Sequence, residues 1–559
     1  MKTTNKVSIN RLVEICYLKG IRNVVFSPGS RNAPLVIAFH AAQKFDIQTI
    51  PDERCAAFFA MGQGLSTGRP TVICCTSGSA VLNYAPAIVE AYYQHIPLVV
   101  ITADRPSLWI DQGVGQSMRQ KNVYQNYIKK SYSWVEEATD PEDLRTNDSM
   151  VITAIDQSMD LPYGPVHINI PFQEPLYDQI DYVQPIIEIE TGESSKSVPE
   201  VDLLEELKND WLTAKKKIII AGMMSPGSKL GQQLSELSER KDIVLLTEKT
   251  SNISCGNDIA SLDRVLHGIS EESDYSADFL ISIGGPIVSK KIKQFFLHNK
   301  PTKHWFIDEG PLQDTYLAKP KYLSDTHTVM DLLVKIPNAN SSLFQDNWQR
   351  LQKSTDLKHR AFLKSCPFSD LKVFELLFKL IPNGVDLHLA NSTPIRYAQL
   401  FADRKDLQYF SNRGVSGIDG STSTALGFAS MSNSQNSVLI TGDLSFFYDS
   451  NAFWLQEIPQ NLTIVIINNG GGGIFRYIPG PASTGQLETV FEAPHNLTAE
   501  HICRMYGIQY TSIRTAEKLA DVLEQSFTRK ELNLVEVFTP RLVNADILKS
   551  YFKSMSVEE

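Results

Sequence analysis

Two apolar runs in the last third of the sequence each stop at a polar motif that contains glycine. The run 437–441 is followed by Gly442-Asp443-Leu444, and the run 463–467 is followed by Asn468-Asn469 and four glycines. Short continuous apolar runs are typical of parallel strands that are buried on both faces. Because open α/β sheets bind ligands at the carboxyl ends of such strands, the pattern predicts a ligand site beside these two motifs.

The residues of the two motifs suit a metal ion and a phosphate group. Asp443 and Asn469 would present hard oxygen atoms from neighbouring loops, which suits Mg²⁺, an ion that completes its coordination with phosphate oxygens and water. The glycines at 470–473 would let the backbone approach a phosphate and turn N–H groups toward it. The alternative at this point is that Asp443 caps a helix and that Asn468-Asn469-Gly470 forms an ordinary turn.

Composition excludes several other classes of protein. The chain has 559 residues, of which 42% are hydrophobic and 21% are charged, as in globular proteins. A net charge of −10 without a basic tract argues against a general nucleic-acid binder. The seven cysteines show no paired spacing, which favours reduced thiols in a cytoplasm and gives no sign of zinc. With no signal peptide and no apolar run of ~18 residues, we expect a cytoplasmic protein without integral membrane association.

Two polar stretches, 190–199 and 336–342, are interpreted as linkers between domains. They predict three domains, at 1–189, 200–336 and 345–559. In each domain short β-rich runs alternate with helical patterns such as 56–64 and 80–93. We therefore expect an α/β protein with three consecutive domains, each with a mainly parallel sheet flanked by helices. The predicted strands are 24–26, 71–75, 98–101, 217–220, 279–283, 304–307, 386–389, 437–441, 463–467 and 532–537.

Two N-terminal motifs are ambiguous when they are considered alone. Asp52 and Glu53 precede a helical run, where acidic residues favour the positive end of the helix dipole. The stretch Ser27–Leu35 follows a strand and opens a helix, so Ser30, Asn32 and nearby N–H groups suit an anion, and Arg31 could hold a carboxylate with two parallel bonds. The alternative is a surface turn with a solvated arginine.

Several further motifs occur in order along the chain. Together with the motifs above they are SPGSRNAPL (27–35), PDERCAAFFAMG (51–62), TSGSAVLNYAPAIVEA (76–91), TADRP (102–106), GQSMRQ (115–120), NSTPIR (391–396), SNRGVSGIDG (411–420) and NNGGGGIF (468–475). With these motifs the chain resembles the thiamine-diphosphate-dependent 2-succinyl-5-enolpyruvyl-6-hydroxy-3-cyclohexene-1-carboxylate synthases of menaquinone biosynthesis. One departure is Leu444, where glycine is commoner in thiamine-diphosphate enzymes. In the middle domain the resemblance depends mainly on 284–291.

The resemblance implies roles for individual residues. Glu53 would be the catalytic acid that activates the cofactor. Mg²⁺, or Mn²⁺ in its place, would bind Asp443, Asn469 and the Gly471 carbonyl. The other residues implied in cofactor binding are Ser392, Ile418, Gly442, Leu444, Gly472, Ile474 and Phe475. Those implied in substrate binding are Ser30, Arg31, Asn32, Arg105, Gln116, Lys290, Ser392, Arg396, Arg413 and Phe475.

The resemblance also implies the reaction and the assembly. The enzyme would decarboxylate 2-oxoglutarate and add the resulting succinyl semialdehyde carbanion to isochorismate in a 1,4 sense. Both substrates are dicarboxylates, and the planar fork of arginine matches a carboxylate. The resemblance further implies a homodimer or homotetramer with the cofactor across a subunit interface. Two alternatives remain open: another thiamine-diphosphate decarboxylase or carboligase, and a catalytically silent cofactor-binding protein.

Overall fold

The structure, a computed structural model, describes residues 1–187, 201–253, 255–337, 343–432 and 436–556. The first predicted linker, at 190–199, and most of the second, at 338–342, lie outside these ranges. The described chain forms two compact units. Unit 1 comprises 1–194, 412–434 and 445–462, and unit 2 comprises 195–411, 435–444 and 463–559.

Unit 1 contains a six-stranded sheet in the order β3-β2-β4-β5-β7-β6, and every pairing in it is parallel. Helices α1, α2 and α6 cover one face, where they pack on β2, β4, β5 and β7. Helix α3 packs against β2, β4 and β5. The strands are β2 (Asn23–Phe26), β3 (Asp46–Thr49), β4 (Thr71–Cys75), β5 (Leu98–Asp104), β6 (Ser131–Ser133) and β7 (Pro165–Pro171), with an antiparallel pair β1 (Lys2–Thr4) and β8 (Gln179–Asp181). The helices are α1 (Val7–Leu18), α2 (Ala33–Ala42), α3 (Glu53–Thr67), α4 (Ser79–Asn83), α5 (Ala85–Gln94), α6 (Pro141–Met159) and α16 (Ser421–Met431).

The helix predicted over 80–93 is divided in the structure. It forms α4 and α5, with Tyr84 at the junction and Pro86 in the first turn of α5. Proline has no N–H to donate and is tolerated only in the first turn of a helix, so a new helix begins there.

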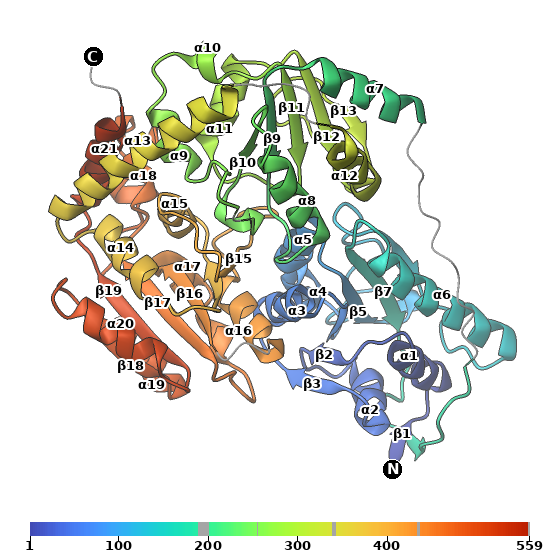
Figure 1. Cartoon of the computed structure of the whole chain (residues 1–559). Coiled ribbons are helices and arrows are strands. Elements are labelled where there is room, and N and C mark those ends of the chain that lie inside the picture. The colour runs from blue at the N-terminus through green and yellow to red at the C-terminus, as the bar shows by residue number, and fades with distance from the viewer. Residues whose placement is uncertain (188–200, 254, 338–342, 433–435, 557–559) are drawn as a thin grey trace. The chain divides into compact units, whose positions relative to one another are not determined.

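Unit 2 contains a five-stranded parallel sheet in the order β10-β9-β11-β12-β13. Helices α7, α8 and α12 pack on one face, and α9, α11 and α13 pack on the other (Figure 1). The strands are β9 (Lys217–Ala221), β10 (Ile243–Leu246), β11 (Phe279–Ile283), β12 (Lys303–Ile307) and β13 (Lys321–Leu323). The helices are α7 (Val201–Thr213), α8 (Lys229–Ser238), α9 (Leu262–His267), α10 (Glu272–Tyr275), α11 (Lys290–His298), α12 (Thr326–Lys335) and α13 (Phe344–Ser365).

Unit 2 also contains a six-stranded sheet in the order β15-β14-β16-β17-β19-β18. Helices α14, α15, α20 and α21 bury their apolar side chains against it. Its strands are β14 (Asp386–Leu389), β15 (Gln408–Phe410), β16 (Ser437–Gly442), β17 (Leu462–Asn468), β18 (Gln509–Ile513) and β19 (Asn533–Phe538). The remaining helices of unit 2 are α14 (Asp370–Leu380), α15 (Thr393–Ala398), α18 (Ile474–Tyr477), α19 (Glu500–Tyr506), α20 (Leu519–Phe527) and α21 (Asn544–Met555). Helix α17 (Asp443–Tyr448) begins with the last two residues of a unit 2 segment and continues in unit 1.

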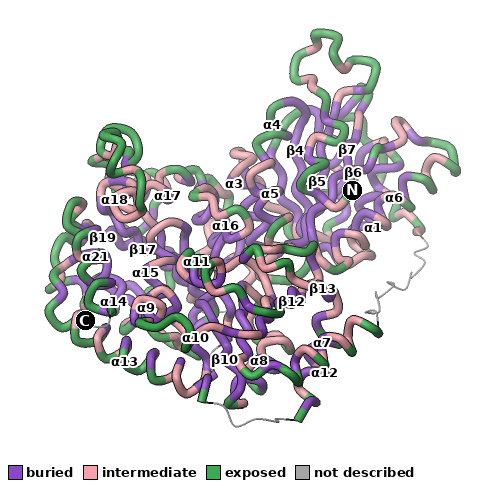
Figure 2. The backbone as a smooth tube through the Cα atoms, turned by 90° about the horizontal axis from the view of Figure 1, so that it is seen from above, coloured by how far each residue is buried: buried purple, intermediate pink, exposed green. Residues whose placement is uncertain are grey.

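The three sheets confirm the predicted α/β class, and each predicted strand overlaps an observed one. The central strands are almost entirely buried, as Figure 2 shows for β4, β5 and β7, in agreement with their continuous apolar sequences, whereas β3, β8 and β18 are more exposed. The domain boundaries at 189, 200, 336 and 345 remain a prediction.

Candidate cofactor and substrate site

Many candidate residues follow strands that are adjacent in a sheet but not consecutive in sequence, so that the strand order reverses between them. In unit 1, β2 and β4 are adjacent although β3 lies between them in sequence, and in unit 2 the same holds for β14 and β16. Loops that leave two such strands diverge and open a crevice at their carboxyl ends. Residues 27–32 and 76–78 follow β2 and β4, and residues 390–392 and Asp443 follow β14 and β16.

Asp443 is buried at the start of α17, and its carboxylate is held by backbone groups. Its Oδ1 accepts from the N–H of Leu444 at 2.6 Å, and its Oδ2 accepts from the N–H groups of Gly470 and Gly471 at 2.8 and 3.0 Å. His495 Nε2 lies 3.4 Å from Oδ2. The two motifs predicted from sequence are therefore joined directly.

The glycine N–H groups do not behave as expected. We predicted that they would turn toward a phosphate, but all four donate within the protein. Gly470 and Gly471 donate to Asp443, Gly472 donates to the carbonyl of Glu492, and Gly473 donates to the carbonyl of Gly471. Their backbone freedom has another use, since Gly471 has φ 144° and a Cβ there would lie 2.5 Å from the Glu492 carbonyl oxygen.

The oxygen atoms around Asn469 fit a small hard cation. Asn469 Oδ1 is buried and has no hydrogen-bond partner among the described residues. A buried amide oxygen without a partner is costly unless a ligand completes it. The Gly471 carbonyl accepts one hydrogen bond and the Asp443 carboxylate accepts three, so each retains a lone pair. These oxygens together match the preference of Mg²⁺.

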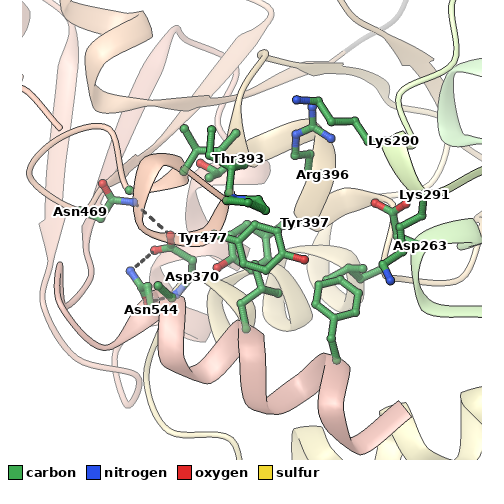
Figure 3. A pocket seen from close by; sticks show the side chains of 18 of the residues that line it. Asp263, Lys290, Lys291, Asp370, Thr393, Arg396, Tyr397, Asn469, Tyr477 and Asn544 are labelled. Carbon is green, nitrogen blue, oxygen red and sulfur yellow. Dashed lines mark hydrogen bonds between the residues drawn. The ribbon is translucent and has the colours of Figure 1, made fainter. Parts of the chain in front are cut away.

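A cavity of about 310 Å³ in unit 2 brings Asn469 together with a cationic group. Figure 3 shows Lys290, Lys291 and Arg396 on one side of this cavity and Asn469 on the other. Ile474, Tyr477 and Phe552 contribute apolar and aromatic wall. Three cationic side chains and the amide of Asn469 thus line the same cavity.

The loop before α11 is fixed by a buried acid. The carboxylate of Glu248 accepts from the N–H groups of Val288 and Ser289 at 2.6 and 2.7 Å. Arg396 Nη1 donates to the Val288 carbonyl at 3.4 Å, and the Ser289 hydroxyl donates to Asp263. Burial raises the pKa of Asp263, while the nearby charges of Arg396 and Lys291 oppose that rise. Lys290 and Lys291, the first two residues of α11, therefore follow a loop that is held by these hydrogen bonds.

Three further candidates, Ser392, Ile474 and Phe475, lie in or next to segments that line this cavity. Ser392 has φ 72°, a left-handed conformation that is unusual for a residue other than glycine and marks a tightly held loop. Ile474 begins the short helix α18. Phe475 follows it, and its ring lies 5.7 Å from that of Phe491.

Glu53 is the first residue of α3 in unit 1. The preceding residue, Asp52, caps the helix by accepting from the N–H of Cys55 at 3.2 Å. Asp52 therefore caps the helix, which is the structural role that an acidic residue could have here. Glu53 is not needed for that cap. Glu53 Oε2 accepts from Asn83 Nδ2 at 3.2 Å.

A second cavity, of about 520 Å³, collects four predicted substrate residues of unit 1: Ser30, Arg31, Arg105 and Gln116. Arg31 is almost completely buried, donates to the Phe172 carbonyl at 3.0 Å and pairs with Glu174 at 3.3 Å. Asn32 does not line this cavity. It is fully buried, and its amide bonds the Gly29 N–H and the Ser27 carbonyl, so it holds the loop together.

Arg413 and Ile418 lie on the segment of unit 1 that precedes α16. The buried carboxylate of Glu90 accepts from the N–H groups of Gly414 and Val415 at 2.6 and 2.7 Å. Burial raises the pKa of Glu90, and the nearby charge of Arg413 lowers it. Ile418 is 37% exposed, as expected of a side chain that contacts a ligand rather than the core.

Comparisons with known proteins identify the family. The chain matches models of the N-terminal thiamine-pyrophosphate-binding domain over residues 9–125, the middle domain over 179–388 and the C-terminal binding domain over 392–537. Proteins named 2-succinyl-5-enolpyruvyl-6-hydroxy-3-cyclohexene-1-carboxylate synthase are similar along nearly the whole chain. The one from Flavobacterium psychrophilum is 40% identical over 98% of both chains, and the one from Flavobacterium johnsoniae is 42% identical over 98% of both. The chain belongs to this synthase family. It is a thiamine-diphosphate-dependent enzyme.

Several residues of this synthase that shape the site were not predicted. Asp263, Asp370, Tyr477 and Lys291 line the cavity of unit 2, and Glu174 contacts Arg31. Lys291 and Tyr477 lie close in sequence to the predicted residues Lys290 and Phe475, whereas the sequence neighbours of Asp263, Asp370 and Glu174 give no sign of function. Asp370, for example, follows Ser369 at a helix start, where an acidic residue is ordinary.

The described part of this synthase contains no helix that is long and apolar enough to span a membrane. Within the same residues, no group of three or more His, Cys, Asp or Glu side chains is arranged to hold a metal ion.

Proposed function

We propose that the enzyme decarboxylates 2-oxoglutarate and adds the four-carbon fragment to isochorismate, giving 2-succinyl-5-enolpyruvyl-6-hydroxy-3-cyclohexene-1-carboxylate. Bound thiamine diphosphate supplies the electron sink that loss of CO₂ from a 2-oxo acid requires. The product name is the one carried by relatives along nearly the whole chain.

The observation that carries the proposal is the shared cavity of unit 2. There Asn469, whose buried amide oxygen has no partner among the described residues, lines one space of about 310 Å³ together with the cations Lys290, Lys291 and Arg396. Asp443, Asn469 and the Gly471 carbonyl would hold Mg²⁺ or Mn²⁺, and the metal would hold the diphosphate of the cofactor. The cations would hold a carboxylate close to that group.

Each remaining candidate has a task in this proposal. Glu53 would activate the cofactor, and Ile418, Ile474 and Phe475 would form apolar walls that exclude water from the reacting carbon. Gly442, Leu444, Gly472 and Ser392 would shape the cofactor loops. Ser30, Arg31, Arg105 and Gln116 would bind the second dicarboxylate, assisted by Arg413, and Asn32 would support that loop from beneath.

The assembly and the location belong to the same proposal. We infer a homodimer or homotetramer in which Glu53 of one chain serves the Asp443 site of another, because closed two-fold assemblies give equivalent sites. We also infer a cytoplasmic enzyme, since its cysteines are all free and buried.

Mass spectrometry of the products tests the reaction. With cofactor and Mg²⁺, 2-oxoglutarate plus isochorismate should give the succinylated cyclohexene carboxylate. Under the same conditions, 2-oxoglutarate alone should release CO₂ slowly and give no such product. Release of CO₂ with no adduct in the presence of isochorismate would indicate another decarboxylase. Cofactor binding without CO₂ release would indicate a silent binding protein.

A further inference from the structure

A buried carboxylate outside the predicted set contacts the metal-binding amide. Asp370, the first residue of α14, is 2% exposed, and its Oδ2 accepts from Asn469 Nδ2 at 3.1 Å. Figure 3 shows this contact between two residues that line the cavity. Asp370 lies far from Asn469 in sequence and shares no motif with it.

The other oxygen of Asp370 is held by two donors. Its Oδ1 accepts from the Thr539 hydroxyl at 2.5 Å and from Asn544 Nδ2 at 2.9 Å. The amide of Asn544 cannot turn over, because its oxygen accepts from the Asp370 N–H at 3.0 Å. The carboxylate is therefore fixed: one oxygen accepts from Thr539 and Asn544, and the other accepts from Asn469.

The neighbouring asparagine shows what is special about Asn469. The Nδ2 of Asn468 donates to the buried carboxylate of Glu536 at 2.7 Å, and its Oδ1 accepts from the Gly470 N–H at 3.1 Å. Both ends of that amide are used inside the protein. In Asn469 only the nitrogen end is used, and the buried oxygen has no partner among the described residues.

We propose that Asp370 is a positioning residue that fixes the Asn469 amide with its oxygen turned to the Mg²⁺ site. This inference rests on the proposed function, which makes Asn469 a metal ligand. A turned amide would place its oxygen against the Asp370 carboxylate, two acceptors in contact without a proton between them. It would also present an NH₂ group, which cannot bind a cation, to the metal.

The variant Asp370→Asn should reverse the amide. The oxygen of the introduced asparagine must face Asn544 Nδ2, so its NH₂ group faces Asn469. Asn469 should then turn its own oxygen toward that NH₂ group and its nitrogen toward the metal. Partners that orient a metal ligand typically contribute about 10–100-fold to metal affinity, and we expect a loss of that size.

The experiment measures Mn²⁺ affinity of the full-length enzyme by electron paramagnetic resonance, with thiamine diphosphate at saturation and no substrate. Glu536→Gln is the matched control, because it makes the same change beside Asn468, and it should keep the wild-type affinity. The double variant Asp370→Asn/Asn469→Asp should recover affinity, since the introduced amide can donate to one carboxylate oxygen and leave the other for the metal.

The outcomes separate this inference from the proposed function. Wild-type Mn²⁺ affinity in folded Asp370→Asn, or no recovery in the double variant, would overturn the role of Asp370. A lower unfolding temperature with unchanged affinity would mean that Asp370 only stabilises the fold. Asn469→Ala tests the metal site itself, and if it bound Mn²⁺ normally, the ligand assignment would fail. Should Asp370→Asn not fold, Asp370→Ser removes the same acceptor in a smaller side chain and should show the same loss.

Discussion

At the scale of single residues, adjacent side chains with the same chemistry have different tasks. Asp52 caps α3 while Glu53 contacts Asn83, and the amide of Asn468 is satisfied internally while that of Asn469 keeps a free oxygen. In each pair the two side chains leave the backbone in different directions, so one makes a local structural bond and the next makes a different contact. Such pairs provide matched controls.

We expect Glu53→Gln to lower turnover by about 10²–10⁴-fold, the range typical of a residue that transfers a proton, while cofactor affinity stays near wild type. The metal and diphosphate would be held by Asp443 and Asn469, which this change does not touch. Turnover by product formation and cofactor binding by calorimetry check the two parts. Asp52→Asn is the control and should remain active, because asparagine caps a helix as well as aspartate does. Wild-type turnover in Glu53→Gln would show that Glu53 has no catalytic role.

Arg31→Ala should raise the KM for a dicarboxylate substrate, because a buried guanidinium that binds a carboxylate typically contributes about 2–5 kcal/mol. Steady-state kinetics with each substrate varied in turn would show which one Arg31 binds. Arg31→Lys keeps the charge but loses the planar fork, so it should fall between the alanine variant and the wild type. Unchanged KM values for both substrates in Arg31→Ala would exclude Arg31 from the substrate site.

At the scale of elements, the helices α3 and α16 of unit 1 cross very closely. A Cβ at Gly62 would lie 2.1 Å from the Thr424 carbonyl oxygen, and one at Gly427 would lie 1.9 Å from the Phe59 carbonyl oxygen. Glycine is required on both sides because the backbones themselves are in contact. The crossing joins α3, which begins at Glu53, to the helix that follows Arg413 and Ile418.

Gly62→Ala should therefore destabilise the enzyme by about 3 kcal/mol, the upper end of the usual cost of overpacking, since a backbone atom cannot move aside as a side chain can. Urea unfolding followed by circular dichroism measures this change. Gly256→Ala is a suitable control, because a Cβ there meets nothing within 4 Å. Equal stability of the two variants would mean that the crossing readily opens.

At the scale of the whole molecule, the two six-stranded sheets have the same strand order when their strands are counted along the chain. In each sheet the first and third strands are adjacent, and candidate residues follow them: the proposed anion-binding loops in unit 1, and the proposed metal-binding loop in unit 2. We therefore propose that one active site uses both sheets.

The proposed assembly predicts complementation between inactive chains. Mixing Glu53→Gln chains with Asp443→Ala chains should restore part of the activity, because a hybrid dimer would contain one intact site. Chains of the double variant Glu53→Gln/Asp443→Ala mixed with Glu53→Gln chains provide the control and should stay inactive, since no intact site can form. Product formation after exchange of subunits, verified by native mass spectrometry, measures the result. No recovery in hybrids would place each site within one chain.

The sequence alone predicted the class of fold and the strands that carry the metal motifs. Runs such as 437–441 and 463–467 are recognisable because burial on both faces of a sheet demands a continuous apolar sequence, which is a local property. For the same reason it predicted that Asp443 and Asn469 end neighbouring strands, and the structure joins their loops through two hydrogen bonds.

Only the tertiary structure showed which distant side chains complete those motifs. Asp370 contacts Asn469, Glu248 holds the loop before Lys290, and Glu90 holds the backbone after Arg413. The neighbours of Asp370 and Glu248 in sequence indicate no more than a helix or a strand end. Glu90 lies in the motif 76–91, but that motif did not show that Glu90 contacts residues 414 and 415. A contact between residues far apart in sequence depends on the path of the chain through the sheets, and periodicity and local motifs do not record that path.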